Sequence, residues 1–245
     1  MTTSSRKVLA FDIWGQMGHF RKYYGTSSAM TYSIPPPTTV RGIIGAFLGL
    51  ERKEYNTFLD ERDTKISVYP VCVKNRWYTT LNIINTKDYM WRGEVGHSQV
   101  NYEFLMDPRF RVYLSVRDRK VHETLKYYLG THRSVYDISL GLTFCLANYS
   151  LRGEYTAYPE YLNGENDVSF SSAIPMYGWD HLGPALDSGA DYTYQKEARV
   201  PIEMDPDRTV RKYGDVMFDP REGHKCTVRA KGTCWNIEDE HIVFF

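Results

Sequence analysis

The sequence predicts an α+β fold, because runs rich in β-branched and aromatic residues alternate with two segments whose apolar residues recur at helical spacing. The order strand, helix, strands, helix, strand is that of a ferredoxin-like βαββαβ unit with an extra insertion. Before residue 150, buried-type strands are predicted over residues 8–14, 66–73, 77–84 and 142–149. Beyond Gly153 the pattern weakens into short β segments, with the best candidates at 190–203, 209–218 and 225–231.

The first helix is predicted to follow the prolines at 35–37, with Thr38 or Thr39 as its N-cap. Its apolar residues fall on one face: Val40, Ile43, Ile44, Phe47 and Leu48. A second stripe consists of Gly42, Gly45 and Gly49, and glycines cost helix stability. The stripe therefore predicts close packing against the helix, most simply by a sheet, although a partner protein or a nucleic acid also fits.

The second helix is predicted from Val121, Leu125, Tyr128 and Leu129, and it ends at Gly130. Before it, apolar residues alternate over 100–106 and again over 110–116, on either side of Asp107 and Pro108. This pattern predicts a hairpin over 99–117 that projects from the sheet and exposes Arg109, Arg111 and Arg117.

Composition narrows the class of protein. The 245 residues suffice for one large domain or two small ones, and the formal net charge is zero. The charge is unevenly distributed, since residues 1–133 carry 20 Lys and Arg against 12 Asp and Glu, whereas residues 134–245 carry 10 against 18. This asymmetry indicates a basic surface suited to phosphates, unless the two halves interleave in space.

No apolar run approaches the roughly 20 residues that a membrane-spanning helix needs, and the N-terminal MTTSSRK has no signal-peptide core. The four cysteines, at 72, 145, 226 and 234, match no zinc motif, and His224 with Cys226 supplies only two ligands. We therefore expect reduced thiols in a cytoplasmic protein, without a metal or cofactor.

The long segment 15–37 combines cations with aromatic rings. His19, Arg21 and Lys22 stand beside Tyr23 and Tyr24, and the segment ends at a helix start whose N–H groups can meet a phosphate. Charge for the backbone and rings for the bases are what a single-stranded RNA site needs. A surface that binds only protein, through its tyrosines and glycine stripe, is an alternative.

Three stretches of the sequence resemble a known family. The first contains the runs His19-Phe20-Arg21-Lys22, Ser27-Ser28, Tyr32, Pro35-Pro36, Thr38-Thr39 and Gly42-Ile43-Ile44-Gly45-Ala46-Phe47-Leu48-Gly49. Together they resemble the N-terminal signature of the CRISPR-associated Cas-five family, in its type I-B form. The runs at 139–142, 144–147 and 200–203 resemble later parts of that family. Similar proteins often carry a basic residue where this chain has Pro37.

The resemblance implies an RRM-like domain over 1–150 with an inserted β-hairpin thumb at approximately 78–117, and a smaller β-rich region over 151–245. It implies a non-catalytic subunit that caps the 5′ handle of CRISPR RNA in a Cascade complex, in antiviral defence. Its partners would be that handle, the backbone subunit, the large subunit and target DNA beside the protospacer-adjacent motif, and not a membrane.

The candidate RNA-binding residues are Gly18, His19, Phe20, Arg21, Lys22, Tyr23, Ser27, Ser28, Tyr32, Thr38, Thr39 and Arg41. The candidate thumb and partner contacts are Trp91, Arg92, Arg109 and Arg111. One branch of the family, in type I-C, cleaves the repeat without metal by means of Tyr, Lys and His. The alternative function is therefore a metal-independent endoribonuclease that uses His19, Lys22 and Tyr23.

Overall fold

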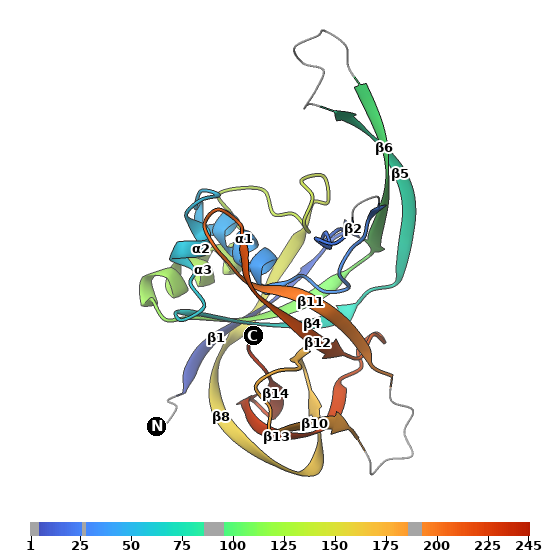
Figure 1. Cartoon of the computed structure of the whole chain (residues 1–245). Helices are drawn as coiled ribbons and strands as arrows, with labels where there is room; N and C mark the ends of the chain where they lie inside the picture. The colour runs from blue at the N-terminus through green and yellow to red at the C-terminus, as the bar shows by residue number, and fades with distance from the viewer. Residues whose placement is uncertain (1–4, 26–27, 86–95, 186–192) are drawn as a thin grey trace.

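A computed structural model of the chain describes residues 5–25, 28–85, 96–185 and 193–245 and confirms the α+β class (Figure 1). The predicted site residues Ser27, Trp91 and Arg92 lie outside the described residues. None of the helices in these ranges is both long enough and apolar enough to cross a membrane.

One seven-stranded sheet organises the molecule, in the order β10-β13-β14-β8-β1-β7-β4, with β13 also pairing with β8. Its strands are β1 (Arg6–Trp14), β4 (Thr64–Cys72), β7 (Arg109–Val116), β8 (Asn148–Phe170), β10 (His181–Pro184), β13 (Cys226–Ile237) and β14 (Glu240–Ile242). Along the chain, β1, α1, β4, β7, α3 and β8 follow the predicted βαββαβ order, but the strand predicted over 142–149 is wrong, because β8 begins only at Asn148. The neighbouring pairs β8–β1, β1–β7 and β7–β4 are all antiparallel.

The helices are α1 (Pro37–Leu48), α2 (Tyr55–Phe58) and α3 (Arg119–Gly130). The N-cap of α1 is Pro36, without a side-chain hydrogen bond, so the prediction that Thr38 or Thr39 caps this helix is wrong. Pro37 begins the helix because a proline in the first turn loses no hydrogen bond and has its φ angle preset. By contrast, α3 has a side-chain cap, because the Asp118 carboxylate accepts hydrogen bonds from the N–H groups of Lys120 and Val121.

Both faces of β1 are buried. Leu9, Phe11 and Ile13 belong to the main core, together with apolar side chains of α1 and α3. The alternate residues Val8 and Ala10 belong to a second cluster on the opposite face. The helices therefore cover one face of the sheet, and the C-terminal strands contribute to covering the other.

A long hairpin extends away from the body (Figure 1), and we call it the thumb. It consists of β5 (Asn75–Asn85) and β6 (Gly96–Met106), which pair antiparallel from Asn75 and Met106 to Asn85 and Gly96. The short strands β2 (Met17–Gly18) and β3 (Ser28–Ala29) also pair with β6.

The predicted hairpin over 99–117 is wrong, because β6 pairs with β5 whereas β7 pairs with β1 and β4. Asp107 has a φ of 47°, and its N–H donates to the Gln16 carbonyl, so the chain changes sheets at this turn. The alternation of β7 buries Phe110, Val112 and Leu114 in the main core. Arg109 and Arg111 consequently lie on a central strand and not on the thumb.

The remaining strands β11 (Gln195–Met204), β12 (Val210–Phe218) and β9 (Ile174–Pro175) form a three-stranded sheet. Val200, Ile202, Val216 and Phe218 join the main core, and β11 packs beside α1. The 23-residue β8 pairs with β1 along its first part and with β13 along its second part. The division into 1–150 and 151–245 stays a prediction.

The glycine stripe of α1 gives a stability prediction. A Cβ atom at position 45 would lie 2.9 Å from the Tyr55 Cβ, whereas one at position 42 would lie 3.8 Å from the Tyr55 ring, an ordinary contact. Gly45→Ala should lower the free energy of unfolding by about 1–3 kcal/mol through overpacking. The control Gly42→Ala should raise it by up to about 1 kcal/mol through helix propensity. Chemical denaturation measures both, and equal effects would contradict the packing shown.

Candidate nucleic-acid interface

Two adjoining cavities form an open groove between α1, the 15–36 segment and the turn that joins β11 to β12. Their volumes are about 400 Å³ and 330 Å³, and both are lined by Arg21, Pro201, Met204 and Arg208. Arg52 lines the second cavity but not the first. We call this feature the arginine groove after Arg21, Arg52 and Arg208.

The groove has a surplus of unpaired positive charge. Within the described residues, none of the guanidinium groups of Arg21, Arg52 and Arg208 has an ion-pair partner. Two carboxylates also line the groove, those of Asp137 and Asp207. The Asp207 carboxylate already accepts hydrogen bonds from the Thr209 N–H and hydroxyl, at 2.9 and 3.0 Å. Arginine side chains without partners favour an anionic ligand.

The first turn of α1 lies along the groove, and it offers fewer free N–H groups for a phosphate than the sequence predicted. Pro37 has no N–H, and the N–H groups of Thr39 and Val40 both donate to the Pro36 carbonyl, at 2.9 and 3.0 Å. In the described chain only the Thr38 N–H of this turn lacks a hydrogen-bond partner. The helix start therefore offers one free N–H group and its dipole, and the arginine side chains are the main positively charged groups of the groove.

An exposed group of rings adjoins the second cavity, and we call it the aromatic cluster. The Tyr23 ring lies 5.2 Å from the Tyr24 ring and 4.8 Å from the Tyr213 ring, measured between centroids. The Arg199 guanidinium lies 5.3 Å from the Tyr23 ring and 5.1 Å from the Tyr213 ring. Tyr23 and Tyr24 are each nearly half exposed, at 46% and 47%, so part of each ring is open to solvent.

Two buried carboxylates hold the 15–36 segment in place. Glu103 of β6 is 3% exposed and accepts hydrogen bonds from the Thr31 N–H, Arg76 Nη1 and the Tyr78 hydroxyl. Burial alone would raise the pKa of Glu103, but hydrogen bonds from Arg76, Thr31 and Tyr78 outweigh it and lower the pKa. The carboxyl group therefore stays ionised and buried at neutral pH.

Glu197 of β11 is also 3% exposed. It lies 2.8 Å from Lys22 Nζ and accepts a hydrogen bond of 2.5 Å from the Ser33 hydroxyl. Arg76 Nη2 approaches the same carboxylate at 3.6 Å, so this arginine spans both acids. Lys22 is consequently engaged within the protein, whereas its neighbour Arg21 faces the groove.

The predicted RNA-binding residues separate into two groups. Arg21, Tyr23 and Thr39 have accessible surface along the groove or the aromatic cluster, and Ser28 is half-buried in β3. Lys22 is half-buried, Ser27 lies outside the described residues, and the remaining six are buried, namely Gly18, His19, Phe20, Tyr32, Thr38 and Arg41. Phe20 and Tyr32 are core residues, and Arg41 donates to the Ile202 carbonyl at 2.8 Å. Although buried, four of these residues also line the two cavities, namely His19, Phe20, Thr38 and Tyr32.

Arg109 and Arg111, the predicted partner contacts, are both paired with a buried acid. Their guanidinium groups donate to the buried Asp12 carboxylate at 2.9 and 2.8 Å. Arg109 also lies 5.2 Å from the centroid of the Trp14 ring. Both residues lie on β7 and not on the thumb, and their role as partner contacts stays a prediction.

The alternative catalytic residues have separate partners. His19 Nδ1 donates to the Glu103 carbonyl at 2.8 Å, and burial lowers the pKa of His19. Lys22 pairs with Glu197, and Tyr23 belongs to the aromatic cluster. The described contacts join each side chain to a different group and do not bring the three together.

Sequence reasoning missed Arg52, Arg199, Arg208 and Tyr213. Arg199 and Arg208 both have positive φ angles, 52° and 71°, in or beside the β11–β12 hairpin. A signal was present at Arg208, because an arginine in a turn rich in Asp and Pro is bound to be exposed. Nothing local in the sequence relates these residues to Arg21.

An α+β body with a projecting hairpin and an open basic groove, flanked by exposed rings, defines a class of protein suited to an extended anionic ligand. The family model described as "CRISPR-associated protein (Cas_Cas5)" matches residues 8–216. The chain therefore belongs to the CRISPR-associated Cas-five family, as the sequence resemblance indicated. A comparison with curated proteins gave no match.

Three solved structures are similar to this chain. One is named "Crystal structure of a CRISPR protein from Archaeoglobus fulgidus", with 14% identity over 98% of each chain and a TM-score of 0.49. A second, "CRISPR RNA-guided surveillance complex", has 10% identity over 97% of this chain and 91% of that chain, with a TM-score of 0.48. A third, a type III-B Cmr-beta complex bound to cognate target RNA and AMPPnP, has 12% identity over 92% and 86%, with a TM-score of 0.45. The family assignment rests on the family model alone.

The buried acids give a pH-dependent prediction. Glu103 has a lowered pKa, so its stabilising effect is fully present above its ordinary value of 4.5 and is lost as pH falls through the lower folded value. Arg76→Met should lower the free energy of unfolding by about 3 kcal/mol at pH 7, because it leaves a buried carboxylate without its cation.

This deficit should shrink as the pH is lowered below 4.5, since protonation of Glu103 then weakens the same interaction in the wild type. Thermal and urea unfolding across that range measures it. The control is Lys74→Met, which removes an exposed pair with Asp107 and should cost no more than about 1 kcal/mol at any pH. A deficit for Arg76→Met that does not change with pH would contradict this account.

Proposed function

We propose that this chain is a non-catalytic RNA-binding subunit of a CRISPR effector complex of the Cascade type, and that it holds the 5′ handle of CRISPR RNA. The observation that carries the proposal is the arginine groove, whose three guanidinium groups have no ion-pair partner in the described part of the chain and adjoin the aromatic cluster.

The chemistry of the two features is complementary. Guanidinium groups bind phosphate oxygens through paired hydrogen bonds, so Arg21, Arg52 and Arg208 suit a backbone that runs along the groove. The rings of Tyr23, Tyr24 and Tyr213 suit unstacked bases of a single strand. An open groove of this kind admits a chain of nucleotides better than a compact metabolite, which needs a more enclosing pocket.

The thumb supports assembly with a neighbouring subunit. Tyr78 and Ile84, which share one face of β5, are exposed by 68% and 56%, and Trp77, on the other face, is exposed by 47%. We assign the face with Tyr78 and Ile84 to the backbone subunit of the complex. The same proposal includes contacts with the large subunit and with target DNA beside the protospacer-adjacent motif. It also keeps Trp91 and Arg92, which lie outside the described residues, as candidate partner contacts.

The groove gives the first functional prediction. The double variant Arg21→Ala, Arg208→Ala should weaken binding of a labelled repeat RNA by tenfold or more, at roughly 1.4 kcal/mol for each tenfold loss. The slope of log affinity against log salt should flatten by about 1.4, since each phosphate contact on a single strand contributes roughly 0.7. Filter binding at several salt concentrations measures both quantities.

The control is Arg119→Ala, Lys120→Ala, which removes the same charge from an exposed turn of α3 outside the groove. Its affinity and slope should stay close to wild type. Lys22→Ala is unsuitable as a test, because it would leave the buried Glu197 carboxylate with only the more distant Arg76 as a cation. Equal losses in the groove variant and the control would remove the groove from the site.

The second functional prediction separates binding from cleavage. The purified chain should leave repeat RNA intact with or without EDTA, since His19, Lys22 and Tyr23 have separate partners and a metal-free ribonuclease needs its base and acid within hydrogen-bond reach of the scissile bond. Incubation of labelled repeat with excess protein tests this. Defined cleavage that is lost in Tyr23→Phe and His19→Gln would establish the nuclease instead.

A further inference from the structure

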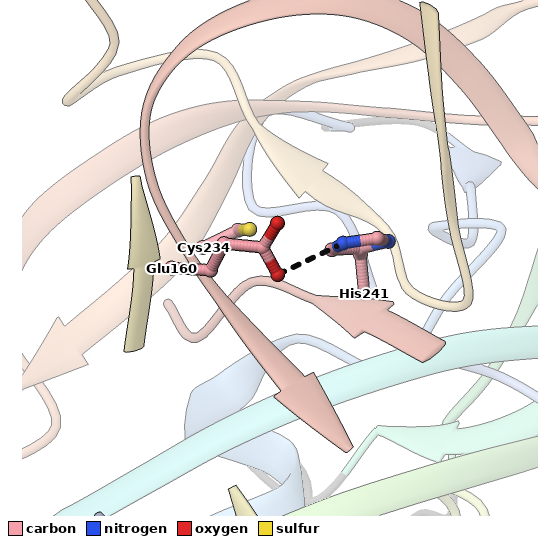
Figure 2. A group of neighbouring side chains, drawn as sticks. All are labelled: Glu160, Cys234 and His241. Carbon is pink, nitrogen blue, oxygen red and sulfur yellow. Dashed lines mark hydrogen bonds and ion pairs between the residues drawn. The ribbon is translucent and has the colours of Figure 1, made fainter. Parts of the chain in front are cut away.

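Three possible metal ligands converge on three neighbouring strands of the main sheet, β8, β13 and β14, far along the chain from the groove residues of the N-terminal segment. Glu160 of β8, Cys234 of β13 and His241 of β14 each offer one ligand atom, and these atoms all lie within 4.8 Å of one another. Figure 2 shows the carboxylate of Glu160 between the thiol of Cys234 and the imidazole of His241. The distance from His241 Nε2 to Glu160 Oε2 is 3.2 Å.

The strand register fixes this arrangement. Cys234 and Glu160 are directly opposite residues of the antiparallel pair β13–β8, so their side chains share one face of the sheet. His241 lies opposite Asn236 in the β13–β14 pair and is the residue through which β14 pairs with β8. Asn236 Nδ2 also donates to Glu160 Oε2 at 3.2 Å and so orients the carboxylate.

The Cys234 side chain is fully buried, and its sulfur lies on the same face of the sheet as the Glu160 carboxylate and the His241 imidazole. A divalent ion between them would bind the thiolate, because metal binding deprotonates a coordinating thiol. Glu160 and His241 have side chains 43% and 22% exposed, so an ion can enter from solvent.

We propose that Glu160, Cys234 and His241 bind a zinc ion, with water as the fourth ligand. Sulfur, imidazole nitrogen and carboxylate oxygen are the donors that zinc takes in proteins. Zinc bonds of about 2.0–2.3 Å in a tetrahedron place ligand atoms roughly 3.3–3.7 Å apart, so modest side-chain rotations complete the site. Across the described residues this is the one group of three such side chains with ligand atoms this close.

The zinc ion would fasten the last strand to the sheet. β14 has three residues, and the chain after it enters the interior, where the Val243 N–H donates to the Ser172 hydroxyl and the Phe245 N–H to the Ile66 carbonyl. Phe245 belongs to the main core. A metal that joins β8, β13 and β14 would therefore stabilise the closure of that core.

Metal binding to the full chain tests the proposal. Protein stripped with EDTA and then freed of chelator should bind one zinc ion in calorimetry, and its Tm should rise by about 5–10 °C at a zinc concentration a hundredfold above Kd. Cobalt in place of zinc should give the intense visible bands of a tetrahedral site and a sulfur-to-metal charge-transfer band. Absence of binding at micromolar zinc would overturn the proposal.

Matched variants locate the site. Cys234→Ser should abolish the sulfur band, and His241→Gln should weaken zinc binding at least tenfold. His241 is partly exposed, so His241→Gln keeps the test valid even where the buried Cys234→Ser chain fails to fold. The control Cys226→Ser changes a buried thiol on the same strand that lies outside the group and should bind zinc normally. Equal zinc affinity in His241→Gln and the wild type would contradict the assignment.

Discussion

The burial of two carboxylates, Glu103 and Glu197, governs the architecture around the groove. A buried carboxylate is tolerated only when cations and hydrogen-bond donors surround it. Arg76 at the base of the thumb reaches both acids, and Lys22 and Ser33 of the 15–36 segment reach Glu197. The thumb, the long N-terminal segment and β11 are consequently fixed relative to one another, so these acids determine which cations remain available at the surface.

The opposite orientations of the Arg21 and Lys22 side chains follow from this constraint. The two residues are adjacent, and Lys22 turns inward to Glu197 while Arg21 lines the groove. The C-terminal half carries net negative charge, yet it supplies Arg199 and Arg208 to the same face. The two halves of the chain therefore interleave, and local geometry matters more for the surface potential than the charge of either half.

Much of the fold was predictable from local patterns. The helical spacing over 40–48 and 121–129 predicted α1 and α3, and β-branched runs predicted most strands, because these signals depend on residues close in the chain. The prediction of a hairpin over 99–117 was wrong because an alternating pattern shows that a segment is a strand but not which strand it pairs with. The turn at Asp107 was recognised, but it separates two sheets and does not join a pair.

The candidate site was predictable where it is contiguous. Arg21 and Tyr23 were found because cations and rings adjoin in the sequence, but Phe20, Tyr32 and Arg41 looked equivalent to them and are buried. Arg208 and Tyr213 were missed because the fold brings them to the groove and to Tyr23 from a distant segment. Glu160, Cys234 and His241 likewise match no spacing motif, since strand register and not sequence brings them together.

The most direct measurement is ultraviolet crosslinking of the effector complex purified from cells that carry the whole operon, with mass spectrometry of the peptides attached to RNA. We predict crosslinks between nucleotides of the 5′ handle and the peptides that contain Tyr23, Tyr24 and Tyr213 of the aromatic cluster. A handle that crosslinks to other subunits, with none of these peptides modified, would contradict the account.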